Sequence, residues 1–161
     1  MTARRSYEGT PVPVSKSQGE LRTLLQKFGA QQFSFGEGRD WAGLEFVHAE
    51  HLVRVRCPLR TPTDGEVTAF NRSSHKGVAD AAIALLDREA MRVWRVLVWT
   101  IKARLVAVDE GLETFESTFL SNLVDPSTNT TIWEQMRQPV EGGMFALGGP
   151  GLRALNPGGQ R

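Results

Sequence analysis

The sequence predicts a single α+β domain, with an antiparallel sheet packed against a long amphipathic helix and a shorter second helix. Short segments with alternating apolar residues, separated by turn formers, fill residues 31–59. From residue 78 to 110, in contrast, apolar residues recur with helical spacing. Strands joined by hairpins and followed by grouped helices are typical of the α+β class. The expected order is β-α-β-β-β and then helices.

The chain of 161 residues suits one domain with a core of its own. We expect a flexible N-terminus over 1–10, the domain over 11–137, and a flexible tail over 138–161. That tail is rich in Gly and Pro and has little apolar periodicity.

The first elements are predicted from turn and cap signals. "TPVPV", ending at Val14, is expected to be a short edge strand, because proline cannot donate to a sheet ladder. A capping-box pattern from Ser17 to Glu20 then predicts a helix over 18–28, which Gly29 would end.

Three strands follow. Phe33 and Phe35 lie on one face of the first, and "GEGRD" is a turn. If Ala49 and Glu50 form the next turn, the two strands that flank it pair in one register. One face then carries His48–His51, Phe46–Val53, Leu44–Val55 and Ala42–Cys57, and the other carries Val47–Leu52, Glu45–Arg54 and Gly43–Arg56. A slip of one residue would bury both arginines, so this register is favoured.

The rest of the domain is predicted to be mainly helical. Residues 60–77 form a polar connection without regular structure, either mobile or functional. A long helix covers 78–110, and a second helix covers 112–123. A turn and a short strand or helical turn around Ile132 and Trp133 come last.

The long helix has two different faces. At 100° per residue, an arc of about 120° collects its core stripe, which consists of Leu86, Ala90, Val93, Trp94, Leu97, Ile101, Leu105, Val108 and Leu112. The opposite face collects Arg88, Arg92, Arg95 and Lys102, with Trp99 among them. Arg104 falls within the apolar arc, where it would extend to solvent or meet an acid.

Two interpretations of the basic face remain open. In the first it is a solvated surface that pairs with neighbouring carboxylates, and Trp99 packs under the second helix; this is the default. The carboxylates are Asp87, Glu89, Asp109 and Glu110. In the second, Arg88, Arg92, Arg95 and Lys102 contact phosphates while Trp99 stacks on a base. Arg54 and Arg56 would extend that track if the helix and the outer face of the sheet are neighbours.

Composition and motifs argue against other classes of function. The net charge of +1 indicates no general affinity for nucleic acid, so a basic surface must be local. His48 and His51 lack a third metal ligand, and Cys57 lacks a neighbouring base. We therefore expect no metal site, no cofactor and no enzymatic activity. Without a signal peptide or a long apolar segment, a cytoplasmic protein that does not enter the membrane is expected.

Three segments, "VSKSQGELRTLLQKFGAQQFSF" (14–35), "WRVLVWTIKARLVAVDEG" (94–111) and "TFESTFL" (114–120), carry a resemblance. Together they resemble a set of small uncharacterised proteins encoded by bacteriophages and prophages, across most of 12–136. Those proteins often have a Pro-Asp-Gly turn where this chain has "DPSTNTTIW". The resemblance implies a phage or prophage origin and no particular activity.

Two hypotheses of function follow. The first is a phage accessory protein that binds single-stranded nucleic acid in replication, recombination or expression. The second is a protein-interaction or homo-oligomeric module, acting on itself or on a host or phage protein through Trp99, Trp133 or the segment "GGMFALGG".

Overall fold

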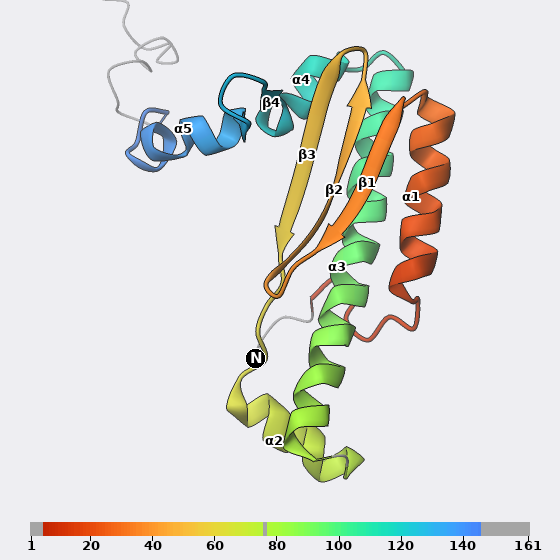
Figure 1. Cartoon of the computed structure of the whole chain (residues 1–161), viewed down its shortest axis with the longest axis vertical. Coiled ribbons are helices and arrows are strands. Elements are labelled where there is room, and N and C mark those ends of the chain that lie inside the picture. The colour runs from red at the N-terminus through yellow and green to blue at the C-terminus, as the bar shows by residue number, and fades with distance from the viewer. Residues whose placement is uncertain (1–4, 76, 146–161) are drawn as a thin grey trace, which may run out of the picture.

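The computed structural model describes residues 5–75 and 77–145 and confirms the α+β class (Figure 1). Its elements are α1 (Val14–Phe28), β1 (Gln32–Glu37), β2 (Trp41–His48), β3 (His51–Pro58), α2 (Asp64–Ser74), α3 (Val78–Asp109), α4 (Phe115–Phe119), the 3-10 turn η1 (Leu120–Asn122), β4 (Val124–Asp125), β5 (Thr130–Thr131) and α5 (Ile132–Glu141). Within this part of the chain, no helix is long and apolar enough to span a membrane.

The main sheet is antiparallel with the order β1-β2-β3. The predicted register of β2 and β3 is confirmed at every pair, from His48–His51 to Ala42–Cys57. Ala49 and Glu50 both have positive φ, 47° and 69°. This is the geometry of a type I′ turn, whose twist matches that of the two strands.

The core lies between one face of the sheet and the helices α1 and α3. In Figure 1, α3 runs behind the sheet and α1 lies to its right. Trp94, Phe46 and Phe119 are the largest fully buried side chains. The indole N–H of Trp94 donates to the carboxylate of Glu37 on β1. The core stripe predicted for α3 is buried from Ala90 to Leu105, whereas Leu112 lies beyond the helix and is exposed.

The prediction of an N-terminal edge strand is wrong. Residues 10–13 form no strand, and α1 begins at Val14 with Pro13 as its N-cap. The extended conformation of Pro13 (φ −66°, ψ 154°) suits that position, where the N–H missing from proline costs nothing. Ser17 is therefore inside α1 and fully buried, so the predicted capping box does not form.

The connection over 60–77 is not structureless, because it contains α2. Thr63 and Glu66 form a capping box at its start, and Arg60 pairs with Glu66 at 2.7 Å. The T-x-x-E pattern that announces such a cap is present in "TPTDGE". The predicted second helix is shorter than expected, since only α4 and η1 form within 112–123.

The C-terminal part ends in a helix that leaves the body of the domain. Thr131 and Glu134 form the capping box of α5, which runs to Glu141 and so passes the expected boundary at residue 137. Figure 1 shows β4, β5 and α5 as an arm that extends away from the edge of β3. The remainder of the expected tail, residues 146–161, lies outside the described residues.

Candidate nucleic-acid interface

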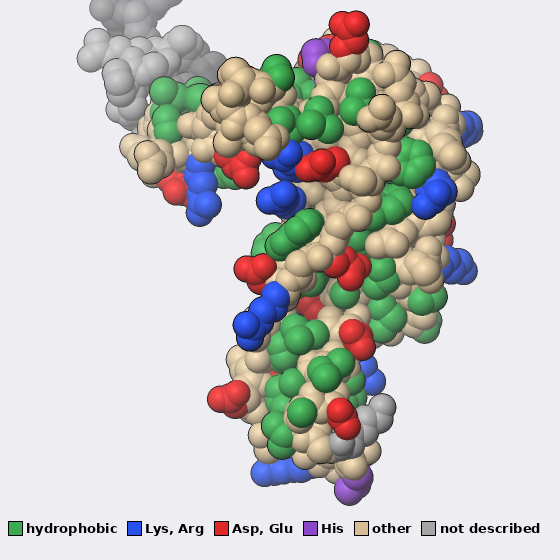
Figure 2. All heavy atoms as spheres, in the orientation of Figure 1, with side chains coloured by type: hydrophobic (Ala, Val, Ile, Leu, Met, Phe, Trp, Pro, Cys, Tyr) green, Lys and Arg blue, Asp and Glu red, His purple; other side chains and the backbone are tan. Residues whose placement is uncertain are grey.

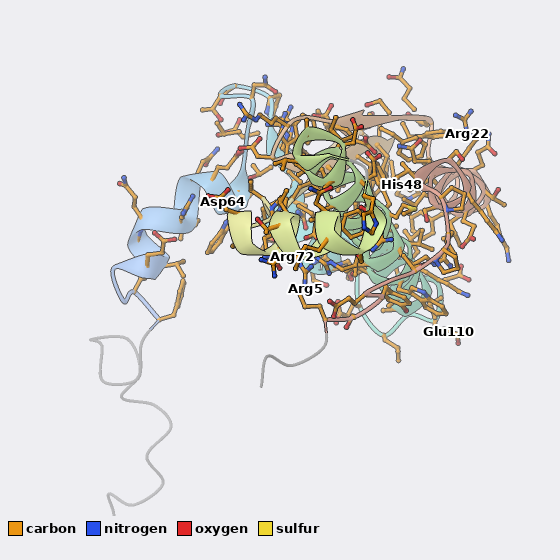
Figure 3. The ribbon with its side chains drawn as sticks, turned by 90° about the horizontal axis from the view of Figure 1, so that it is seen from below. Arg5, Arg22, His48, Asp64, Arg72 and Glu110 are labelled. Atoms are coloured by element: carbon orange, nitrogen blue, oxygen red, sulfur yellow. The ribbon has the colours of Figure 1, made fainter. Side chains whose placement is uncertain are left out.

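The seven residues predicted to bind nucleic acid do not form one continuous surface. They separate into three groups around α3: Arg88 and Arg92 beside α2, then Arg95, Trp99 and Lys102 beside α1, then Arg54 and Arg56 beside α5. Seen from below in Figure 3, α1 and α5 lie on opposite sides of α3. The basic face of α3 and the pair Arg54 and Arg56 are therefore separate surfaces, and a track that joins them has to cross α3.

The first group is held by contacts within the protein. Arg88 lies over the ring of Phe70, 4.6 Å from its centroid. Arg92 donates from Nε and Nη2 to Glu89, at 3.0 and 2.9 Å, and Arg5 binds the same carboxylate at 2.9 Å. Glu89 is buried, which raises its pKa, but the hydrogen bonds from Arg92 and Arg5 outweigh burial and bring the pKa to about 2. For Arg92, pairing with a neighbouring carboxylate is thus confirmed.

The second group lines a groove of about 550 Å³ between α1 and α3, which we call the lysine groove. Its walls are Lys16, Gly19, Glu20, Thr23 and Leu24 from α1, and Arg95, Val98, Trp99 and Lys102 from α3. A smaller hollow shares Leu24 and Lys102 with it and extends it to Lys27 and Val106. Within the described residues, Lys16, Lys27 and Lys102 form no ion pair.

Trp99 is the exposed aromatic residue of this groove. Its side chain is 47% exposed, so the prediction that it packs under the second helix is wrong. The ring of Tyr7 lies nearly parallel to it, at 7° and 6.5 Å between centroids. Lys102 Nζ lies 5.3 Å from the centroid of the Trp99 ring. Two aromatic faces and a cation therefore gather on one side of α3.

Arg95 is less available than its neighbours. Its Nη2 donates to Glu20 Oε2 at 2.8 Å, and this hydrogen bond is the largest cause that lowers the pKa of Glu20. Only 13% of the Arg95 side chain is exposed. Its Nη1 is buried without a hydrogen-bond partner among the described residues. In the groove, the lysines carry the accessible positive charge.

The third group lines a cleft of about 620 Å³ between β3, α3 and α5, which we call the arginine cleft. Figure 2 shows a hollow beneath the arm, with Lys and Arg side chains on both of its sides. Arg54 binds Glu45 and also donates to the carbonyl and side-chain oxygens of Asn129, at 2.9 and 3.0 Å. It therefore fastens the β4–β5 turn to the sheet. Arg56 is exposed and lies over the ring of Trp41, 4.7 Å from its centroid.

Sequence reasoning did not place three members of the arginine cleft. Arg104, expected to extend to solvent or meet an acid, donates to the amide of Asn122 at 2.8 Å and lies over Phe119. Trp133 and Arg137 come from α5, where the sequence predicts only a short strand or helical turn around Ile132 and Trp133, followed from residue 138 by the tail. Its capping box, "TIWE", was the signal for that helix.

The histidines and the cysteine have structural positions. His48 packs between Phe28 and Phe115, with ring centroids 4.6 and 4.8 Å away. His51 lies near Glu116 on the surface, at 3.6 Å. Across residues 5–75 and 77–145, no three His, Cys, Asp or Glu residues gather as a metal site. Burial raises the pKa of the Cys57 thiol.

Comparison with family models, curated proteins and solved structures finds no match for this chain.

Proposed function

We propose that this protein binds single-stranded nucleic acid in the lysine groove. The observation that carries the proposal is the placement of Trp99, which is 47% exposed beside Lys102 and parallel to Tyr7. An indole in the core of a domain contributes to stability, whereas the half-exposed indole of Trp99 can also stack on an aromatic ring of a ligand.

The chemistry of the groove matches an unpaired strand. Stacking of a base on an aromatic side chain contributes about 1–3 kcal/mol and tolerates every base. Lys16 and Lys102 flank the groove and form no ion pair within the described part of the chain, so their ammonium groups are free to contact phosphates. Neutralising phosphates releases counterions, and binding should therefore weaken as salt is added.

The resemblance to phage and prophage proteins supports a place for this activity. Single strands are exposed during replication, recombination and expression, and we place the protein there as an accessory factor that binds without catalysis. Its net charge of +1 fits a local site better than a coating of the whole surface.

Fluorescence titration tests the proposal. An oligothymidylate at low salt should quench tryptophan emission, and Trp99→Ala should remove most of the affinity while Trp99→Phe retains part of it. Lys102→Gln and Lys16→Gln should each weaken binding and reduce its salt dependence. Arg22→Gln, an exposed change elsewhere on α1, is the matched control. If the wild-type protein shows no binding at low salt, the proposal is wrong.

A second candidate function is self-association or binding of another protein. Figure 1 shows that α2 and the first turns of α3 project beyond the sheet. There Val78 and Ile83 are 63% and 57% exposed. Exposed apolar side chains on a projecting helical pair are typical of interaction surfaces. Analytical ultracentrifugation separates the two functions: an oligomer that Ile83→Gln dissociates, in a protein that binds no oligonucleotide, would favour this one.

A further inference from the structure

We propose that the bound strand leaves the lysine groove, crosses α3 at Ala103 and enters the arginine cleft. This inference rests on the proposed function, because it extends the path of the same ligand. It joins two sites that the fold places on opposite flanks of one helix.

The order of residues along α3 places Ala103 between the two sites. Lys102 lines the lysine groove and Arg104 lines the arginine cleft. Successive residues of a helix are turned by about 100°, so the side chain of Ala103 points midway between these two. Ala103 is exposed, which identifies this midway direction as the solvent side of α3. The path across the helix at this residue is therefore open to solvent.

The side chain at the crossing point is also small. Ala103 carries only a methyl group, whereas Trp99 and Val106, one turn away on either side, are large and 47% and 49% exposed. A strand that crosses between them meets the least side-chain bulk. Its bases then have the Trp99 ring on the groove side of the helix.

The cleft offers cations that form no ion pair in the described part of the chain. Arg56 and Arg104 have no carboxylate partner within the described residues; one lies over Trp41 and the other binds the amide of Asn122. Glu134 is the only carboxylate among the described residues that line the cleft. Its oxygen accepts from the N–H and hydroxyl of Thr131, at 2.7 and 3.0 Å, in the cap of α5. Two arginines are thus available to phosphates.

Trp133 favours a nucleic acid over an acidic peptide in this cleft. It lines the side formed by α5 and is 44% exposed. A row of carboxylates would need the cations alone, whereas a strand of nucleotides also uses aromatic faces. The two sites repeat one combination, an exposed indole with unpaired cations, on the two sides of Ala103.

The test compares oligothymidylates of about 4 and about 16 nucleotides, the range of site sizes of single-strand binding domains. Because the longer strand also offers more registers, the decisive comparison is between variants. Arg56→Gln should weaken binding of the longer strand several-fold, lower its salt slope by about 1, and leave the shorter strand unchanged. Arg22→Gln, which also removes an arginine from an aromatic ring, is the control.

The crossing itself is tested at Ala103. Glu, Lys and Gln are all good helix formers, so Ala103→Glu, Ala103→Lys and Ala103→Gln should fold alike. A single charge beside the path should change the affinity for the longer strand by about fivefold. We expect Ala103→Glu to weaken it, Ala103→Lys to strengthen it, and Ala103→Gln to change it little.

Three outcomes would overturn the inference. If the shorter strand binds but neither Arg56→Gln nor Ala103→Glu affects the longer one, the strand stays in the groove and only the crossing is wrong. If Arg56→Gln instead reduces binding of a polyglutamate peptide, the ligand of the cleft is an acidic protein and not a nucleic acid. If neither oligonucleotide binds, both the proposed function and the crossing are wrong.

Discussion

Glu20 on α1 and Arg95 on α3 form the ion pair that joins the two walls of the lysine groove, with 2.8 Å between Oε2 and Nη2. The Arg95 side chain is mostly buried, whereas Glu20 remains 37% exposed. The pair therefore serves the packing of the helices and at the same time removes one positive charge from the groove.

Glu20→Gln should separate these two roles. We expect the free energy of unfolding to fall by about 1 kcal/mol, since a hydrogen bond between charged groups is lost at a partly solvated site. Affinity for an oligothymidylate should rise, because Arg95 is then free to contact a phosphate. Urea denaturation and fluorescence titration measure the two effects, and a fall in affinity would contradict the role of this pair in the groove.

Glu89 should make stability depend on acid pH. It binds Arg5 and Arg92, and its pKa is about 2 in the folded protein against about 4.5 when unfolded. The unfolded chain binds more protons between these values, so stability is complete above about pH 4.5 and is lost as the pH falls towards 2.

Glu89→Gln removes this contribution. At neutral pH it should lower the free energy of unfolding by about 2–3 kcal/mol, because two arginines are left without their buried partner. The difference from the wild-type protein should shrink below about pH 4.5. Glu66, whose pKa is also about 2, titrates in both proteins and so cancels in the comparison. Asp87→Asn, at an exposed position of the same helix, is the control for a general effect of charge.

Gly19 lies inside α1 and lines the lysine groove, where a Cβ would meet no atom within 4 Å. Gly19→Ala should therefore raise the free energy of unfolding by about 0.5–1 kcal/mol, the usual gain for this change in a helix. Gly19→Glu should fold equally well but weaken oligonucleotide binding, since it adds bulk and a negative charge to the groove. Equal affinity in Gly19→Ala and Gly19→Glu would show that the strand does not pass this residue.

Gly43 lies in β2, the central strand of the sheet, and unlike Gly19 it has no space for a Cβ. A Cβ there would lie 2.2 Å from the carbonyl oxygen of Val55 and 3.1 Å from the Cα of Arg56. Because both atoms belong to the backbone, strands β2 and β3 must separate, and Gly43→Ala should cost more than about 2 kcal/mol. Gly65→Ala, where a Cβ has open space, should change thermal stability little or raise it.

Cys57 should react slowly with thiol reagents. Burial raises its pKa above the usual value, so less thiolate is present near neutral pH. The rate of modification in the folded protein should keep rising at pH values where an unfolded control has already reached its plateau. A plateau at the same pH in both would contradict this effect of burial.

The hairpin of β2 and β3 could be predicted from sequence to the single residue, because the pattern that specifies it is local. The alternation of apolar residues and the two-residue turn at Ala49 allow only one register with both arginines outside the core. The first segment was misjudged because "TPVPV" fits an edge strand and a helix N-terminus equally well, and only the contacts of α1 with α3 distinguish them.

The sequence alone determined the class of the fold, the register of the hairpin and the buried stripe of α3, since each depends on neighbours a few residues apart. Tertiary structure decided which charges remain free. Arg95 forms an ion pair with Glu20. Arg92 and Arg5 both form ion pairs with Glu89. Lys102, in contrast, is left exposed. The tertiary structure also places Arg54 and Arg56 beside α5, which is distant from them in the sequence. Ion pairs and clefts depend on residues that only the folded chain brings together, so a helical wheel describes a basic face but not its availability.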